Sequence, residues 1–121
     1  MQLKVKATNI SLSPEISEYL DKRLRTVEKF VSDYQETTLI EAELGKTTAH
    51  HQTGNIFRAE INLSIEGKLF RAAQEASDLY SAIDAVKDEI IETLRGFKDK
   101  KSSLAKRTGQ RLKYFLRKFY K

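Results

Sequence analysis

The sequence predicts an α+β domain in which two helices pack on one face of a four-stranded sheet. Short segments that alternate apolar and polar residues predict strands, and two longer segments with apolar residues at three- and four-residue spacing predict helices. They follow one another in the order β-α-β-β-β-α. Each strand then has one apolar face and each helix one apolar stripe, and stacking the helices on the sheet buries them together.

The N-terminal segment predicts a strand followed by a helix. Leu3, Val5 and Ala7 alternate with polar residues, which is typical of a strand with one buried face. Ser13 and Pro14 then predict a helix start, because serine caps free backbone N–H groups and proline fits the first turn. The apolar stripe of this helix, which is expected to run to about Asp33, comprises Ile16, Leu20, Leu24, Val27 and Val31.

The middle of the chain predicts three more strands. Segments 37–46 and 57–66 alternate apolar and polar residues, and a polar loop, KTTAHHQTGN, separates them. A tight turn through Gly67 leads into a fourth strand. The inward-facing residues of that strand are expected to be Phe70, Ala72 and Ala76.

A second helix ends the predicted domain. Ser77 and Asp78 are expected to cap it, and its apolar stripe comprises Leu79, Ile83, Val86, Ile90, Leu94 and Phe97. The charge balance changes sign after this helix: residues 1–98 hold 13 basic and 16 acidic side chains, whereas residues 99–121 hold nine basic and one acidic. We therefore divide the chain into an α+β domain, residues 1–98, and a basic tail, residues 99–121.

Two stretches of the chain resemble one protein family. In this element order, SPEISEYLDKRLRTVEKF and EASDLYSAIDAVKDEIIETLRGFKDK are similar to the ribosome hibernation-promoting factors, also called ribosome-associated translation inhibitors. The signature acid-x-x-D-[LM]-Y-x-A-I-[DN] appears from Glu75 to Asp84, and the likeness runs from Met1 to about Lys100. The resemblance implies binding to the small ribosomal subunit and its rRNA in the decoding region, where mRNA and tRNA would lie. It implies silencing of idle ribosomes without a cofactor.

The resemblance also implies which side chains contact RNA. It assigns this role to Arg23, Lys29, Arg95, Lys98 and Lys100. Two other positions at which the family usually has basic residues carry Glu89 and Glu92. Helix geometry alone adds Lys22, Arg25 and Lys87, which share helix sides with these residues. On charge alone, cations on helices are ordinary solvated residues, and it is the resemblance that favours an RNA surface.

The signature residues Asp78, Tyr80 and Asp84 are assigned a structural role first and an RNA role second. Tyr80 is expected to pack half-buried with a solvated hydroxyl, and Asp84 is an acid favoured by the helix dipole near the helix start. The long members of the family carry a separate C-terminal dimerisation domain, and the residues after Lys100 are too few for one. We therefore expect no dedicated dimerisation domain.

The tail predicts a short basic amphipathic helix, because Leu112, Phe115, Leu116 and Phe119 recur at helical spacing. Charge alone nominates further RNA contacts at Lys101, Lys106, Arg107, Arg111, Lys113, Arg117 and Lys118. The tail fits RNA, an anionic membrane or docking on the domain or on a second copy. Our hypothesis is that it supplies the positive charge that the second helix lacks at Glu89 and Glu92.

Residue types exclude several classes of function. The chain has no cysteine, which excludes disulfides and thiolate metal sites. His50 and His51 are adjacent in a polar loop and point apart, so no metal is expected. No paired nucleophile and base and no phosphate-binding glycine loop are present, so we expect neither an enzyme nor a small-molecule substrate. No apolar run approaches the ~20 residues of a membrane span, so we expect a cytoplasmic protein without a transmembrane segment.

Two alternatives from other classes remain open. The first is an adaptor whose tail binds an anionic membrane or a partner protein, and tail-dependent flotation on liposomes would favour it. The second is a metal-dependent nuclease, and intact RNA after long incubation with Mg²⁺ would exclude it.

Overall fold

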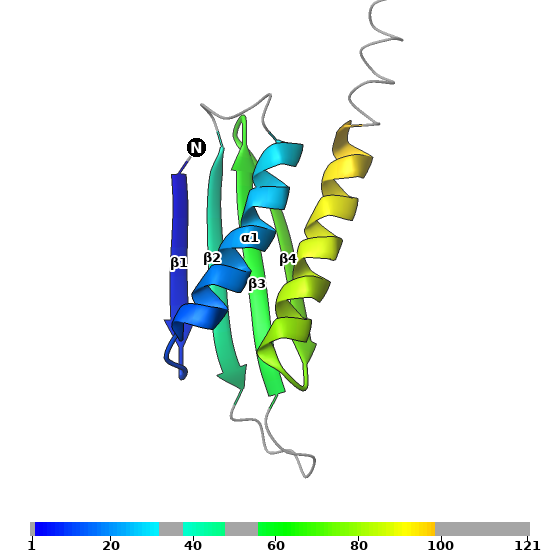
Figure 1. Ribbon diagram of the computed structural model, residues 1–121. Coiled ribbons are helices and arrows are strands. Elements are labelled where there is room, and N and C mark those ends of the chain that lie inside the picture. Colours follow the sequence, from blue (N-terminus) through cyan, green and yellow to red (C-terminus); the bar gives the residue numbers. More distant parts are fainter. Residues whose placement is uncertain (1, 32–37, 48–55, 99–121) are drawn as a thin grey trace, which may run out of the picture.

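The computed structural model describes residues 2–31, 38–47 and 56–98 and confirms the predicted order β-α-β-β-β-α (Figure 1). The elements are β1 (Gln2–Thr8), α1 (Pro14–Phe30), β2 (Leu39–Thr47), β3 (Ile56–Ile65), β4 (Lys68–Ala76) and a second helix over residues 79–98. The loop with His50 and His51 and the tail of residues 99–121 lie outside the described residues.

The four strands form one mixed sheet in the order β1-β2-β3-β4. β1 runs parallel to β2, while β3 pairs antiparallel with both β2 and β4. The helix α1 connects the two parallel strands, as such a crossover requires. Both helices cover the same face of the sheet (Figure 1). No described helix covers the opposite face, which we call the open face.

Both helices begin at the caps predicted from the sequence. The Ser13 hydroxyl accepts a hydrogen bond from the Ile16 N–H at 3.2 Å, and Pro14 occupies the first turn of α1. Asp78 caps the second helix: one carboxylate oxygen accepts from the Ser81 N–H at 2.8 Å and the other from the Ser81 hydroxyl at 2.7 Å. These two bonds fix the start of the helix that carries the signature residues.

The core lies between the helices and β2, β3 and β4. It takes its residues from the apolar stripes that the sequence predicts, and the described part contains no buried side-chain N or O atom without a hydrogen-bond partner. The largest fully buried side chains are Ile40, Leu44, Ile61, Leu63, Ile65, Ile83, Ile90, Leu94, Val27, Val31 and Val86. This core holds the two helices in a fixed relation to each other.

The prediction that β1 buries one face is wrong. Leu3 is 40% exposed, Val5 is 44% exposed, and Ala7 is also exposed. Their register partners on β2 include Ile40 and Ala42, which are buried. The alternation therefore places the apolar residues of β1 on the helix side of the sheet, but most of β1 lies beyond the two helices at the sheet edge (Figure 1). Alternation defines the face of a strand and not what covers it.

The hairpin between β3 and β4 closes as the sequence predicts. Glu66 and Gly67 both have positive φ, 50° and 80°. Two consecutive residues with positive φ make the type I′ turn that matches the twist of two antiparallel strands. On the open face of this hairpin, Glu60 is only 6% exposed. Its carboxylate pairs with Arg71 and, at 3.5 Å, with Arg58, which offsets the cost of burying its charge.

Candidate functional site

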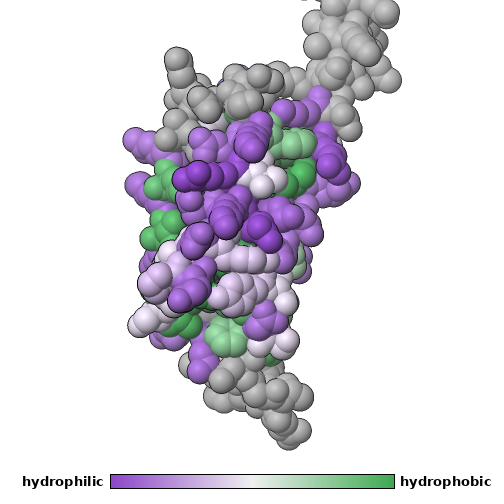
Figure 2. All heavy atoms as spheres, in the orientation of Figure 1, coloured by the Kyte–Doolittle hydropathy of each residue, from purple (hydrophilic) through white to green (hydrophobic). Residues whose placement is uncertain are grey.

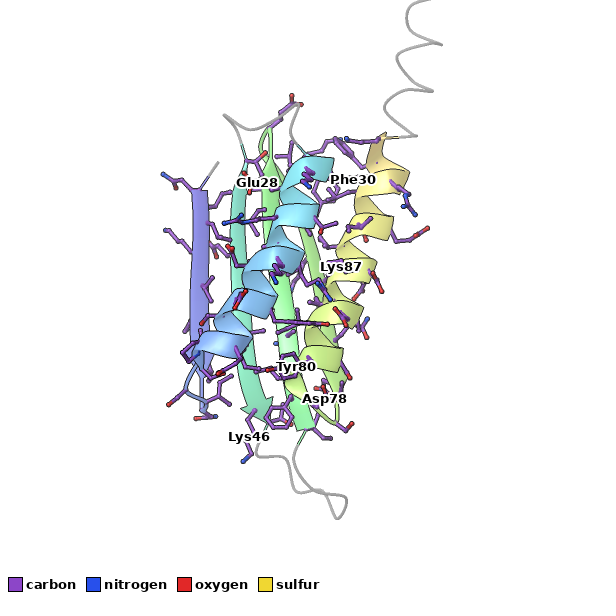
Figure 3. The ribbon with its side chains drawn as sticks, viewed as in Figure 1. Glu28, Phe30, Lys46, Asp78, Tyr80 and Lys87 are labelled. Carbon is purple, nitrogen blue, oxygen red and sulfur yellow. The ribbon has the colours of Figure 1, made fainter. Side chains whose placement is uncertain are left out.

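The two helices direct a row of polar, basic and aromatic side chains toward each other. We call this row the interhelical seam. Figure 3 shows the labelled members Phe30, Lys87 and Tyr80 on the facing sides of the two helices. The seam consists of Tyr19, Arg23 and Phe30 from α1 and of Tyr80, Asp84, Lys87, Arg95 and Lys98 from the second helix.

Asp84 is the centre of a hydrogen-bonded triad that joins the two helices. The Tyr19 hydroxyl donates to one Asp84 carboxylate oxygen at 2.5 Å, and the Arg23 Nε donates to the other at 2.8 Å. Arg23 closes the triangle, because its Nη2 donates to the Tyr19 hydroxyl oxygen at 2.9 Å. Three mutual bonds in a charged group hold each side chain more firmly than a single contact would.

The triad shifts the pKa values of all three groups. The hydrogen bond from Tyr19, followed by the bond from Arg23, lowers the pKa of Asp84. The hydrogen bond to Asp84 raises the pKa of Tyr19, and it likewise raises the pKa of Arg23. These pKa shifts favour a neutral Tyr19 phenol, an ionised Asp84 carboxylate and a charged Arg23 guanidinium. The triad therefore stays in one protonation state at neutral pH.

Aromatic rings extend the triad along the seam. The Tyr80 ring meets the Tyr19 ring edge-on, with centroids 4.8 Å apart and planes at 86°. The Arg23 guanidinium lies 4.2 Å from the centre of the Tyr19 ring. Tyr80 is 40% exposed, so one ring at this end remains accessible to a partner. Tyr80 thus packs against Tyr19 and remains exposed.

A second aromatic cluster lies at the other end of the seam. The Phe30 ring has the Lys98 ammonium 4.6 Å from its centre and the Arg95 guanidinium at 6.0 Å. Both distances fall within the range of cation–π attraction. Phe30 thus holds two cations of the second helix beside the end of α1, next to the point where the tail begins.

The cations of the helices differ in whether an acid already pairs with them. Lys22 pairs with Glu18, Arg25 with Asp21, Lys87 with Asp88 and Arg95 with Glu92, at 3.4, 3.0, 2.6 and 3.6 Å. The pairs of Lys22, Arg25 and Arg95 are exposed on both sides, so they contribute little and exchange partners easily. In the fourth pair the Lys87 side chain is only 21% exposed. Within residues 2–31, 38–47 and 56–98, Lys29 and Lys98 form no ion pair. Among the described cations of the two helices, Lys29 and Lys98 are therefore the ones that could accept a phosphate without losing an acidic partner.

Glu89 lies on the flank of the second helix that faces away from the seam. Its carboxylate accepts a hydrogen bond from the Gln74 side-chain amide of β4 at 2.6 Å. Glu89 follows Asp84 by five residues, which separates the two side chains by roughly 140° around the helix. An acid at this position therefore leaves the seam unchanged. Glu92, in contrast, does affect the seam, because its carboxylate pairs with Arg95, which is a member of the seam.

The structure brings together only part of the predicted contact set. Arg23, Lys87, Arg95 and Lys98 belong to the seam, whereas Lys22, Arg25 and Lys29 lie on the outer side of α1. The remaining predicted contacts are outside the described residues: Lys100, Lys101, Lys106, Arg107, Arg111, Lys113, Arg117 and Lys118. Sequence reasoning missed Tyr19 and Phe30. They lie four residues before and seven residues after Arg23, and this helical spacing is the signal that would have found them.

The described part of the chain offers no metal-ligating cluster and no helix that is long and apolar enough to cross a membrane. Two shallow hollows of the described part lie along the open side of the sheet. One of them has a volume of about 580 Å³ and is lined by Lys4, Val5, Lys6, Glu41, Ala42, Glu43 and Asn62. The seam, with its accessible cations and rings, is therefore the candidate interface.

Comparison with known proteins agrees with the resemblance noted in the sequence. Residues 3–102 match the family described as Sigma 54 modulation protein / S30EA ribosomal protein. The chain belongs to this family. Among curated members, the ribosome hibernation promotion factor of Picosynechococcus is 27% identical over 100 residues, which cover 83% of this chain and 50% of that protein. The ribosome hibernation promoting factor of Klebsiella oxytoca is 25% identical over 100 residues, covering 83% of this chain and 96% of that protein.

Members of this family differ in length. A third relative, the ribosome hibernation promotion factor of Deinococcus radiodurans, is 25% identical over 93 residues and is matched over 45% of its length. The chain thus spans about half of two of these relatives and nearly all of the Klebsiella protein.

Solved structures confirm the fold of the family. The N-terminal domain of Thermus thermophilus Protein Y superposes with a TM-score of 0.62 at 24% identity, covering 80% of this chain and 99% of that domain. A ribosomal subunit interface protein of Coxiella burnetii gives a TM-score of 0.68 at 17% identity, covering 82% of this chain and 99% of that chain.

Proposed function

We propose that the protein is a ribosome hibernation factor that binds the small ribosomal subunit in the decoding region and blocks mRNA and tRNA there. The observation that carries this proposal is the family match over residues 3–102, together with relatives named as hibernation factors. The interhelical seam supports it, because exposed cations and aromatic rings are the groups that contact phosphates and unpaired bases of RNA.

No chemical step is part of this function. Inhibition follows from occupied volume, since a folded domain held by phosphate contacts leaves no space for tRNA or mRNA. Lys98, beside Phe30, contacts RNA phosphate at one end of the seam, and Lys29 contacts phosphate from the outer side of α1. Arg95 exchanges Glu92 for phosphate at little cost, because both side chains of that pair are exposed. Lys87 exchanges Asp88 for phosphate, although the Lys87 side chain is only 21% exposed. Arg23 has a different role: Asp84 and Tyr19 hold it, so it orients the two helices.

The basic tail is proposed to strengthen this binding. Its nine cations add phosphate contacts that depend strongly on salt and little on RNA sequence. Recognition then resides in the fold, where the core fixes the spacing of the seam, and the tail raises affinity for the same subunit.

The experiment is co-sedimentation of the whole chain with isolated small and large subunits across a salt series. We expect selective binding to the small subunit at physiological salt. The double variant Lys29→Glu/Lys98→Glu should weaken this binding at least tenfold, because it reverses two unpaired charges. Lys6→Glu/Lys46→Glu is the control matched in charge, since Lys6 lies on the open face of the sheet and Lys46 at the end of the sheet opposite Phe30 (Figure 3). Equal binding to both subunits, or equal losses in Lys6→Glu/Lys46→Glu and Lys29→Glu/Lys98→Glu, would contradict the proposal.

A further inference from the structure

We propose that the outer edge of β1 binds an extended peptide segment of another protein in which apolar and acidic residues alternate. This surface is separate from the interhelical seam. β1 and β4 are the opposite edges of the sheet, and the second helix follows β4 and lies on that side (Figure 1). The proposal therefore does not depend on ribosome binding.

The backbone of β1 has one bonded side and one outward side. The Gln2 N–H donates to the Thr38 carbonyl at 3.1 Å, and Gln2 is in register with Leu39 of β2. In a parallel ladder, residues that bond to the neighbouring strand alternate with residues that do not. Lys4 and Lys6 consequently bond to β2 in the same way as Gln2. The N–H and C=O groups that point away from the sheet belong to Leu3, Val5 and Ala7.

The same three residues leave apolar surface uncovered. Leu3 and Val5 are 40% and 44% exposed, although Ile40 and Ala42 beside them on β2 are buried. Figure 2 shows apolar surface along the flank that β1 occupies, with hydrophilic surface around it. An added strand would bring its own apolar side chains beside this surface and would pair with the outward backbone groups, which is the mode of strand addition at a sheet edge.

The charges of β1 select the partner. Lys4 and Lys6 lie on the open face of the sheet, in register with Glu41 and Glu43 of β2. Within the described ranges 2–31, 38–47 and 56–98, neither ammonium group forms an ion pair, so both can turn toward a strand added on the outer side. An added strand with acidic residues on that face would place carboxylates opposite the two ammonium groups, and opposite charges across a strand pair stabilise it. The partner strand thus alternates acidic residues on the open face with apolar residues on the helix side.

The same charges disfavour two other occupants. A second copy would pair β1 with β1 antiparallel, and registers centred on residues 4, 5 or 6 place lysine opposite lysine. Lysines on an edge strand are a known protection against such self-pairing. The tail of residues 99–121 is itself strongly basic and meets the same repulsion. An RNA strand would satisfy the lysines but not the apolar surface or the outward backbone groups.

The test measures hydrogen exchange of individual amides by NMR on the whole ¹⁵N-labelled chain. The probe is a blocked octapeptide of alternating valine and glutamate. A matched peptide has the same composition in two blocks, four glutamates followed by four valines, and it meets the basic tail with the same charge. We expect the alternating peptide to slow exchange at Leu3, Val5 and Ala7 roughly tenfold or more. Exchange at Lys4 and Lys6 should change little, because their amides already bond to β2.

Two variants separate backbone pairing from charge. Val5→Pro removes one outward N–H, and proline is tolerated at an edge strand where the N–H faces solvent; we expect it to abolish the protection at Leu3 and Ala7. Lys4→Glu/Lys6→Glu keeps the backbone and reverses the charge. It should weaken binding of the glutamate peptide about tenfold and favour an alternating valine–lysine peptide instead.

Several outcomes would overturn the proposal. Equal protection by the block peptide would show binding by charge without strand pairing. Protection of the three amides in the free protein that grows with its concentration would assign the edge to a second copy. Displacement of the peptide by an octauridylate at the same sites would assign the edge to RNA. If the alternating peptide at millimolar concentration did not slow amide exchange at Leu3, Val5 and Ala7, the proposal would be wrong.

Discussion

Arg23 and Asp84 lie 61 residues apart in the chain, and their side chains meet at 2.8 Å between the two helices. Arg23 had been assigned to RNA contact by resemblance and Asp84 to the helix dipole. The ion pair gives both residues one shared role, because it fixes how α1 and the second helix face each other. The spacing of Lys98 and Arg95 relative to α1 depends on that arrangement.

Asp84→Asn should destabilise the protein more than the same change at a nearby acid. The variant keeps the size of the side chain but removes the charge that two donors share, and we expect the free energy of unfolding to fall by about 1 kcal/mol. Asp88→Asn is the control, because Asp88 is 71% exposed and pairs only with Lys87 among the described residues. Its effect should stay below about 0.5 kcal/mol. Urea unfolding at pH 7 measures both, and equal losses would contradict a special role for Asp84.

The stability of the protein should fall as the solution becomes acidic, and two carboxylates should account for part of the slope. Hydrogen bonds from Tyr19 and Arg23 lower the pKa of Asp84, and hydrogen bonds from the Ser81 side chain and backbone lower the pKa of Asp78. A carboxylate with a lowered pKa in the folded state contributes stability above its ordinary pKa of 3.8. That contribution disappears as the pH falls through the lower folded value.

The measurement is urea unfolding at several pH values from 7 to 3. Wild type should lose stability progressively toward and below pH 4, and Asp84→Asn and Asp78→Asn should each show a shallower dependence in that window. Because Asn does not titrate, any slope that remains in the double variant belongs to other acids. A double variant with the wild-type slope would show that neither carboxylate is responsible.

Much of the fold was predictable because hydrophobic periodicity and helix caps are local features. Ser13, Pro14 and Asp78 mark helix starts within a few residues, and the core stripes follow from spacing alone. The exposure of Val5 was not predictable, since it depends on where a helix lies above the sheet. The contact of Tyr19 with Asp84 was also hidden, because neither sequence spacing nor residue type specifies a partner on another element.

Two leucines of similar sequence context should respond very differently to truncation. Leu63 of β3 is fully buried, so Leu63→Ala should cost about 2–5 kcal/mol through lost burial and the cavity that remains. Leu3 of β1 is 40% exposed, and Leu3→Ala should cost less than about 1 kcal/mol, because water already reaches it. Thermal or urea unfolding of the two variants provides the comparison. A large loss in Leu3→Ala would mean that another part of the chain covers β1.

Glu89 and Glu92 carry the same charge on the same helix, yet Glu92 should limit binding to RNA more than Glu89 does. Glu89 bonds to Gln74 of β4 on the far flank, whereas Glu92 pairs with Arg95 of the seam at 3.6 Å. Glu92→Lys adds a cation and releases Arg95, so we expect tighter binding to the small subunit. It should also steepen the dependence of log affinity on log salt by about one to two, one step for each added phosphate contact.

Glu89→Lys is the matched control for that prediction, because it makes the same change in net charge. It should raise affinity less than Glu92→Lys does, and it should lower stability slightly through the lost bond to Gln74. Co-sedimentation with the small subunit at several salt concentrations measures both variants. If the two substitutions raised affinity equally, net charge alone would govern binding, and the interhelical seam would have no special part in it. If only Glu92→Lys raised affinity, the RNA contact would run along the face that Arg95 shares with Lys98 and Phe30.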